Sequence, residues 1–177
     1  MHLINLRAYT YVDDFNANFI NKLSKNVSII YRNYEETNID QILKIKKLCK
    51  KNKIKFYLSN DVKLAIKLNI DGAYIPAFNK SYSHKSYSLK KKFELIGSAH
   101  NLSEIKIKEK QGVSSIFLSS LFKNDKSNKF LGIYKFFKLM KLTTKNVVCL
   151  GGINKNNIKK IKLLKIHSFA SISMFKK

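Results

Sequence analysis

Short apolar runs alternate with longer lysine-rich stretches along almost the whole chain, and this alternation limits the fold more than any other feature. The runs are rich in β-branched and aromatic residues, which is typical of buried strands. They occupy residues 3–9, 27–32, 54–59, 72–76, 93–98, 115–119, 147–150 and 168–173. The pattern therefore predicts eight strands separated by seven connections.

The connections carry apolar residues at helical spacing, as Ile42, Ile45 and Cys49 do in one of them. Helices are expected at residues 14–24, 40–51, 62–68, 102–110, 133–141 and 156–164, whereas the connection at 79–92 is polar and gives no clear pattern. Such alternation favours a parallel sheet with helices outside it. Eight units in 177 residues leave about 22 residues for each, near the lower limit for a strand, a turn and a helix. We predict an α/β fold, a compact (β/α)₈ TIM barrel that forms a single domain over residues 1–177.

Only four residues follow the last predicted strand, which is too few for an eighth helix. The final helix is therefore expected to be truncated or absent. Either the flank between the first and last strands stays uncovered, or a second copy of the chain covers it in a homo-oligomer.

The chain is strongly basic, with 35 Lys+Arg against 11 Asp+Glu and a formal net charge of +24. Such a charge is common in proteins that bind nucleic acid. However, only Arg7 and Arg32 are arginines, and the lysines are spread along helical faces. Arginine makes the bidentate contacts to phosphate and guanine. We therefore favour a compositional bias, and a lysine-rich nucleic-acid binder is the non-enzymatic alternative.

Cysteine content and the length of the apolar runs indicate a soluble, cytoplasmic protein. Cys49 and Cys149 are too few and too far apart for a disulfide framework or a zinc site. No apolar run approaches the ~18 residues of a membrane-spanning helix. Residues 1–7 lack the order of charged and apolar residues found in a signal peptide.

A barrel predicts where functional groups lie, because its active site forms in the loops after the strands and phosphate often binds after the last two. Gly151 and Gly152 follow the seventh strand, where glycines let backbone N–H groups approach an anion, and the helix expected from residue 156 would add its own N–H groups. A sharp turn is the alternative role of this pair. Ile172 and Ser173 end the eighth strand and would supply further donors.

Polar residues also follow the second, third and fifth strands. Arg32 ends the second strand and suits a phosphate or diphosphate oxygen. Asp61 follows the third strand, where it would either cap the next helix or bind Mg²⁺, with Asn60 touching a phosphate. His100 follows the fifth strand as a cap, a residue satisfied by backbone, or an acid/base group.

The order of these motifs resembles the thiamine phosphate synthase/TenI family. The resemblance covers roughly residues 27–174 and rests on Asn60-Asp61, Asp71-Gly72, Ile96-Gly97-Ser98-Ala99-His100, Gly151-Gly152-Ile153 and Ile172-Ser173. It implies a TIM barrel that joins a hydroxymethylpyrimidine diphosphate to a thiazole phosphate. Thiamine phosphate and pyrophosphate are the products, and Mg²⁺ binds the diphosphate.

The resemblance also implies roles for individual residues. Arg32 and Asn60 would bind the diphosphate, and Asp61 would bind Mg²⁺. Ser98 would contact the pyrophosphate region, and Lys126 matches the family's loop lysine if a one-residue gap is allowed. The thiazole phosphate would bind backbone groups of four residues, Gly151, Gly152, Ile172 and Ser173.

The chain departs from the family's pattern at several positions. The expected Gln-x-Arg-x-Lys is Ile30-Tyr31-Arg32-Asn33-Tyr34, and Ser119-Ser120 replaces a glycine-proline pair. Asn79 stands in place of a second metal-binding Asp, which should weaken the Mg²⁺ site. Two alternatives therefore stay open. One is a TenI-like tautomerase of an aminated thiazole phosphate with His100 as acid/base; the other is a barrel that binds a phosphorylated ligand without turnover.

Overall fold

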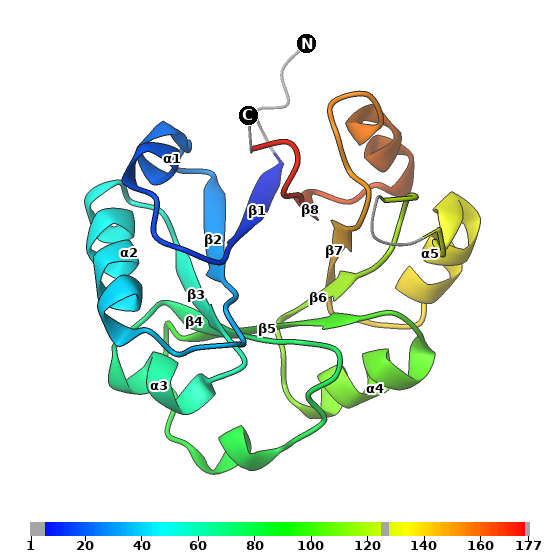
Figure 1. Cartoon of the computed structure of the whole chain (residues 1–177). Coiled ribbons are helices and arrows are strands. Elements are labelled where there is room, and N and C mark those ends of the chain that lie inside the picture. The colour runs from blue at the N-terminus through cyan, green and yellow to red at the C-terminus, as the bar shows by residue number, and fades with distance from the viewer. Residues whose placement is uncertain (1–5, 125–127, 176–177) are drawn as a thin grey trace.

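The computed structural model describes residues 6–124 and 128–175, and within them eight parallel strands close into a barrel (Figure 1). Each strand pairs with its neighbour in the chain, and β8 closes the ring by pairing with β1, where Phe169 lies opposite Ala8. The predicted (β/α)₈ barrel is confirmed. The strands are β1 (Arg7–Val12), β2 (Val27–Tyr31), β3 (Phe56–Ser59), β4 (Gly72–Ile75), β5 (Glu94–Ala99), β6 (Ser115–Leu118), β7 (Asn146–Leu150) and β8 (Ser168–Ala170).

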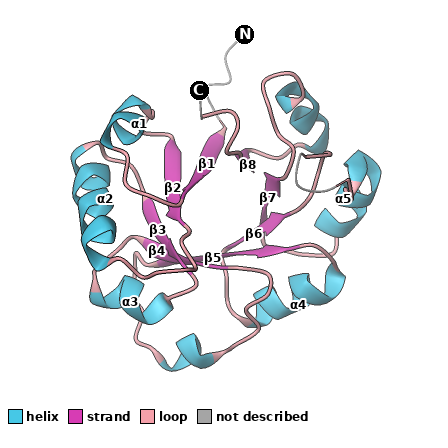
Figure 2. Cartoon of the chain, in the orientation of Figure 1, coloured by secondary structure: helices cyan, strands magenta, loops and turns pink. Residues whose placement is uncertain are grey.

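Helices surround the ring of strands (Figure 2). They are α1 (Ala17–Lys22), α2 (Ile39–Lys51), α3 (Val62–Lys67), α4 (Leu102–Lys110) and α5 (Gly132–Met140), together with the 3₁₀ helices η1 (Ser83–Ser86) and η2 (Ile158–Leu164). The polar connection at 79–92 thus contains η1. None of the helices in the described part of the chain has the length and apolar character needed to cross a bilayer.

Asparagine and aspartate side chains set the starts of four α-helices. Asn16, Asn38, Asp61 and Asn101 each accept a hydrogen bond from the backbone N–H three residues later, at 2.8–3.0 Å. Such N-caps satisfy donors that have no partner inside the helix, and each stabilises its helix by about 1 kcal/mol. The capping role considered for Asp61 is therefore present, and in α4 the cap is Asn101 rather than His100.

Aromatic side chains fill the interior of the barrel. Tyr9 and Tyr74 pack edge-on against Phe117, with ring centroids 4.8 and 5.4 Å away. Gly72 makes room for Tyr57, since a Cβ on Gly72 would lie 2.9 Å from that ring. The inward-facing cluster is Tyr9, Tyr11, Ile30, Tyr57, Tyr74, Ile96, Phe117, Val148 and Ala170.

No helix follows β8 within the described residues, as predicted. Instead, the chain turns, and Phe175 stacks on Phe169 with ring centroids 6.3 Å apart and planes 11° from parallel. Met174 and Phe175 both pack against the hydrophobic core. Met174 and Phe175 thus cover part of the flank beside β8, and a second copy as its cover stays a prediction.

Glu94 joins three strands at the N-terminal end of the barrel. Its Oε2 accepts hydrogen bonds from Tyr57 Oη at 2.6 Å and from Arg7 Nη2 at 3.3 Å, and Lys55 forms an ion pair with its Oε1. Partial burial raises the pKa of Glu94, but the hydrogen bonds from Lys55 and Tyr57 and the charge of Arg7 outweigh burial and hold the pKa below its ordinary value.

Glu94→Gln is expected to lower the free energy of unfolding at pH 7 by about 1–2 kcal/mol. Because the folded pKa is depressed, the carboxylate stabilises the protein above its unfolded pKa, and this contribution is lost as the pH falls from the unfolded pKa through the folded pKa. The variant should therefore lose less stability than the parent over that interval. Thermal unfolding followed by circular dichroism at each pH measures the difference, with the exposed Glu36→Gln as control. Parallel curves for the parent and Glu94→Gln would contradict this expectation.

Candidate functional site

A cavity of about 990 Å³ opens at the C-terminal ends of the strands. It brings together residues that follow β2, β5, β7 and β8, and its wall includes six of the predicted site residues: Arg32, His100, Gly151, Gly152, Ile172 and Ser173. Ser98, Asn60 and Asp61 lie outside this wall. Lys126 lies outside the described residues, while Lys123 and Lys129, on either side of it in the chain, line the cavity.

The turn after β7 depends on its two glycines. Gly151 and Gly152 have φ angles of 97° and 65°, in the left-handed region that favours glycine. A Cβ on Gly151 would lie 2.8 Å from Ser120 Cα, and one on Gly152 would lie 2.6 Å from the Phe122 carbonyl oxygen. The pair therefore serves as a sharp turn packed closely against the connection that follows β6.

The same turn leaves backbone donors available at the cavity. Within the described residues, the N–H groups of Gly151, Gly152, Ile172 and Ser173 donate to no backbone or side-chain acceptor, although all four residues line the cavity. Backbone N–H groups gathered in this way bind phosphate well. A turn and an anion site are thus compatible at this position.

The helix expected to begin near residue 156, just after Gly152, is not formed as predicted. The segment forms η2, which begins only at Ile158, and asparagine side chains occupy the turn before it. Asn154 Oδ1 accepts from the N–H groups of Asn156 and Asn157 at 3.0 and 3.2 Å, and Asn157 Nδ2 donates to the Gly152 carbonyl at 2.7 Å. These N–H groups are therefore already used, and the helix adds no donors to the site.

Arg32 supplies a cation to the same cavity. Its guanidinium carbon lies 4.9 Å from the centroid of the Tyr11 ring, and its Nε lies 3.6 Å from Asp13 Oδ1. The terminal Nη groups have no hydrogen-bond partner among the residues that the structure describes. This contact with the Tyr11 ring helps hold the guanidinium in place and leaves its Nη donors for an oxyanion.

His100 is oriented by Glu104. The Glu104 Oε2 atom accepts from the His100 backbone N–H at 2.7 Å and lies 2.8 Å from His100 Nδ1. Asn101 Nδ2 holds the other carboxylate oxygen at 3.1 Å. Because Glu104 is an acceptor, we assign the proton to Nδ1, which leaves Nε2 for an acid/base role. This pairing was missed in the sequence, where the signal was a glutamate four residues after the histidine.

Ser98 lies in the mouth of the barrel beside two buried tyrosines. Tyr11 Oη donates to Tyr74 Oη at 3.2 Å, and Arg32 lies over the Tyr11 ring. Burial raises the pKa of Tyr74, which hydrogen bonds with Ser98 and Tyr11 partly oppose, and burial also raises the pKa of Tyr11. Both phenols therefore stay neutral near pH 7 and present hydroxyl groups rather than phenolates.

A separate polar group lies at the ends of β3 and β4 and consists of Asn60, Asp61 and Asn79. Asn60 has a φ of 65°, and its Oδ1 accepts from Asn79 Nδ2 at 2.8 Å. Asp61 Oδ1 caps α3 by accepting from the Leu64 N–H at 2.8 Å, and its other oxygen has no partner in the described part of the chain.

The oxygen ligands that Asp61 and its neighbours offer would suit a weakly bound Mg²⁺. No group of three or more His, Cys, Asp or Glu residues that could hold a metal occurs among the described residues. Mg²⁺ is commonly bound by one or two carboxylates together with substrate phosphates and water. The uncommitted Asp61 oxygen provides one such carboxylate ligand, and Asn79 provides no second one.

An aromatic pair beside this polar group was not predicted. Tyr34, in place of the family's lysine, is 49% exposed, and Phe78 is 64% exposed. Their ring centroids lie 5.5 Å apart, and Tyr34 Oη is 2.9 Å from Ser59 Oγ. The departure at Tyr34 was the signal that an aromatic side chain replaces a cation here.

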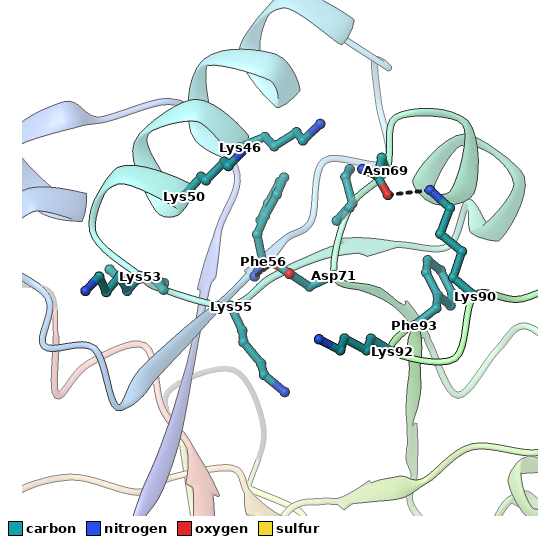
Figure 3. A pocket seen from close by; sticks show the side chains of 12 residues that line it. Lys46, Lys50, Lys53, Lys55, Phe56, Asn69, Asp71, Lys90, Lys92 and Phe93 are labelled. Atoms are coloured by element: carbon teal, nitrogen blue, oxygen red, sulfur yellow. Dashed lines mark hydrogen bonds between the residues drawn. The ribbon is translucent and has the colours of Figure 1, made fainter.

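A second cavity, of about 460 Å³, lies at the opposite end of the barrel, near the starts of β3, β4 and β5 (Figure 3). Protein groups already engage part of its charge. Lys46 Nζ donates to the Leu68 carbonyl and Lys90 Nζ donates to Asn69 Oδ1, each at 2.8 Å. None of the predicted site residues lines it, so the candidate site is the cavity at the strand C-termini. The six lysines of the second cavity are Lys46, Lys50, Lys53, Lys55, Lys90 and Lys92.

The model of the family described as thiamine monophosphate synthase matches residues 17–175. This chain belongs to that family. The thiamine-phosphate synthase of Pelagibacter ubique is 31% identical over 158 residues, which cover 85% of this chain and 75% of that protein. The thiamine-phosphate synthase of Methanococcus vannielii is 26% identical over 132 residues, covering 73% of this chain and 64% of that protein. The family resemblance drawn from the motifs is confirmed.

Solved structures agree with a thiamine monophosphate synthase fold. The thiamine phosphate pyrophosphorylase of Pyrococcus furiosus superposes with a TM-score of 0.76 at 17% identity, covering 99% of this chain and 90% of that one. The thiamine phosphate pyrophosphorylase of Bacteroides thetaiotaomicron gives a TM-score of 0.60 at 17% identity, covering 94% and 82% of the two chains. At these identities the likeness establishes the shared barrel. Thiamine monophosphate synthases are transferases that couple pyrimidine and thiazole phosphates.

Proposed function

We propose that this chain itself carries out the family's coupling reaction at the cavity formed by the strand C-termini. The thiazole nitrogen forms a bond to the pyrimidine methylene carbon while the bond from that carbon to the diphosphate oxygen breaks, and pyrophosphate leaves. The observation that carries the proposal is that one cavity presents two separate anion-binding features. These are the unpaired N–H groups at Gly151, Gly152, Ile172 and Ser173, and the Arg32 guanidinium.

The site's own residues would act mainly through charge and position. The four backbone N–H groups would bind the thiazole phosphate, while Arg32 and Asn60 would bind the departing diphosphate. Ser98 would donate a hydrogen bond toward the negative charge that develops on the leaving oxygen, with the neutral Tyr74 beside it. Such preorganised donors are commonly the largest contribution to catalysis of this kind.

Mg²⁺, when bound, would neutralise charge on the diphosphate, with Asp61 as its protein ligand. Asp61→Asn keeps a side chain that caps α3 but removes the negative charge. We expect the Mg²⁺ concentration for half-maximal rate to rise by about 10-fold, with an unchanged melting temperature. A magnesium titration of both proteins at saturating substrates measures this. An unaltered titration would remove Asp61 from the metal site.

A tautomerase of an aminated thiazole phosphate is the second candidate, and the His100–Glu104 pair favours it. The two functions separate when the protein is incubated with hydroxymethylpyrimidine diphosphate, thiazole phosphate and Mg²⁺, and thiamine phosphate is detected. Slower product formation at limiting Mg²⁺ in Asp61→Asn, but not in His100→Ala, supports coupling. No product from the parent, together with tautomerase activity that His100→Ala abolishes, supports the alternative. RNA binding that falls steeply with salt would instead support the nucleic-acid binder. A cytoplasmic location belongs to the same proposal.

A further inference from the structure

Lys108 is a buried cation that contacts the loop leading out of β4. Its side chain is 0% exposed, although it lies on α4 in a lysine-rich helix. Its Nζ donates to the carbonyl oxygens of Pro76 and Asn79, both at 2.8 Å, and to Gln111 Oε1 at 2.9 Å. Each of the three ammonium protons therefore has an acceptor, and each acceptor is a neutral oxygen.

Gln111 extends this network along the same loop. Its Nε2 donates to the carbonyl oxygens of Asn79 at 3.0 Å and Ser81 at 2.8 Å. The backbone carbonyl oxygen of Gln111 lies 2.7 Å from Nε2 of the buried His84. Lys108 and Gln111 together hold residues 76–84 at four points.

The anchored loop continues directly to the polar group of Asn60, Asp61 and Asn79 at the ends of β3 and β4. The Asn79 carbonyl accepts from Lys108, and the Asn79 side chain donates to Asn60 Oδ1 at 2.8 Å. Only Asn79 therefore separates the buried ammonium from Asn60, which has left-handed backbone and adjoins Asp61. Displacing the loop would displace the Asn60 amide.

Burying a lysine without a carboxylate partner is costly, and an apolar side chain would fill the same space at a lower cost. The glycine at position 97 nevertheless leaves space for the Lys108 side chain, since a Cβ on Gly97 would lie 3.0 Å from Lys108 Cδ. Burial lowers the pKa of Lys108 to about 8, so the group is mostly protonated at pH 7. The acceptors of this buried charge are two carbonyl oxygens of the loop and Gln111, which itself binds the same loop, and this indicates that its task is to hold that loop.

We propose that Lys108 is a positioning residue for the diphosphate half of the site, where it holds the loop at residues 76–84 and thereby places Asn60. The inference rests on the proposed coupling function. It predicts that Lys108 affects one substrate and not the other, because the thiazole phosphate contacts lie after β7 and β8.

Lys108→Met removes the charge and retains an unbranched side chain. We expect KM for hydroxymethylpyrimidine diphosphate to rise at least ~10-fold, with KM for thiazole phosphate unchanged, and amide hydrogen exchange at residues 76–84 to accelerate. Gln111→Met removes two of the loop contacts and is the second variant if Lys108→Met does not fold. It should raise KM for hydroxymethylpyrimidine diphosphate by a smaller factor and leave KM for thiazole phosphate unchanged. Ile105→Val, on the same helix and buried, is the matched control and should leave the ratio of the two KM values unchanged.

Equal rises of both KM values in Lys108→Met, or unchanged KM values with faster exchange in the loop, would overturn the positioning role. A parent protein that makes no thiamine phosphate would refute the coupling function separately. Calorimetric binding of hydroxymethylpyrimidine diphosphate then decides: weaker binding by Lys108→Met supports the positioning role, and equal or absent binding by both proteins overturns it.

Discussion

Gly152→Ala is expected to raise KM for thiazole phosphate at least ~100-fold, because charge-assisted hydrogen bonds contribute about 1.5–3 kcal/mol each and more than one is lost. Alanine is strained at a φ of 65°, and its Cβ would lie 2.6 Å from the Phe122 carbonyl oxygen. The turn must then move away from the connection after β6, and its N–H groups move with it.

Gly112→Ala is a matched control for this substitution. Gly112 has a φ of 79°, but a Cβ there would meet nothing within 4 Å. It should lose about 1 kcal/mol of stability from backbone strain alone and keep KM for thiazole phosphate. Steady-state kinetics and thermal unfolding of both variants separate strain from loss of the phosphate site. A normal KM in a folded Gly152→Ala would exclude this turn as the phosphate site.

Arg32→Gln is expected to lower kcat/KM for hydroxymethylpyrimidine diphosphate by about 10³-fold, the size seen when a preorganised donor to developing charge is removed. The loss should appear in turnover of the diphosphate and leave KM for thiazole phosphate unchanged. Rapid-quench measurement of pyrophosphate release tests the chemical step directly.

Arg32→Lys is the informative companion. It keeps the charge but loses the guanidinium contact with the Tyr11 ring and the paired Nη donors, so about a 10-fold loss is expected. Asp13→Asn removes the ion-pair partner of Arg32 and should change the rate little, because Asp13 is exposed. Activity of Arg32→Gln within a few-fold of the parent would show that the guanidinium does not contact the diphosphate.

The barrel could be predicted because each unit repeats the same pattern of an apolar run followed by a helical stretch. The helix at α4 was predicted with its observed bounds, since Asn101 caps it and Gln111 and Gly112 follow it. The helix expected at 156–164 was wrong in type, because the side chains of Asn154 and Asn157 close turns before Ile158 and leave a 3₁₀ helix. Local polar contacts thus overrode a weak apolar period.

The site was only partly predictable. Chain order brought Arg32, His100 and Gly151 to one cavity, because all strand C-termini meet at the same end of a barrel. Lys108 was not recognised, although it lies three residues after the buried Ile105 and so on the same helix face. In a chain so rich in lysine, one more lysine carries little information, and only the three-dimensional contacts reveal its burial.

The tyrosine and phenylalanine rings in the barrel interior pack edge-on, and Tyr9, Tyr74 and Phe117 are all buried. Interiors packed in this way hold few voids larger than a water molecule. The lysine-lined cavity and the cavity at the strand C-termini therefore lie on opposite sides of a packed core. A lysine substitution at the N-terminal end is expected to leave the chemistry at the other end unchanged.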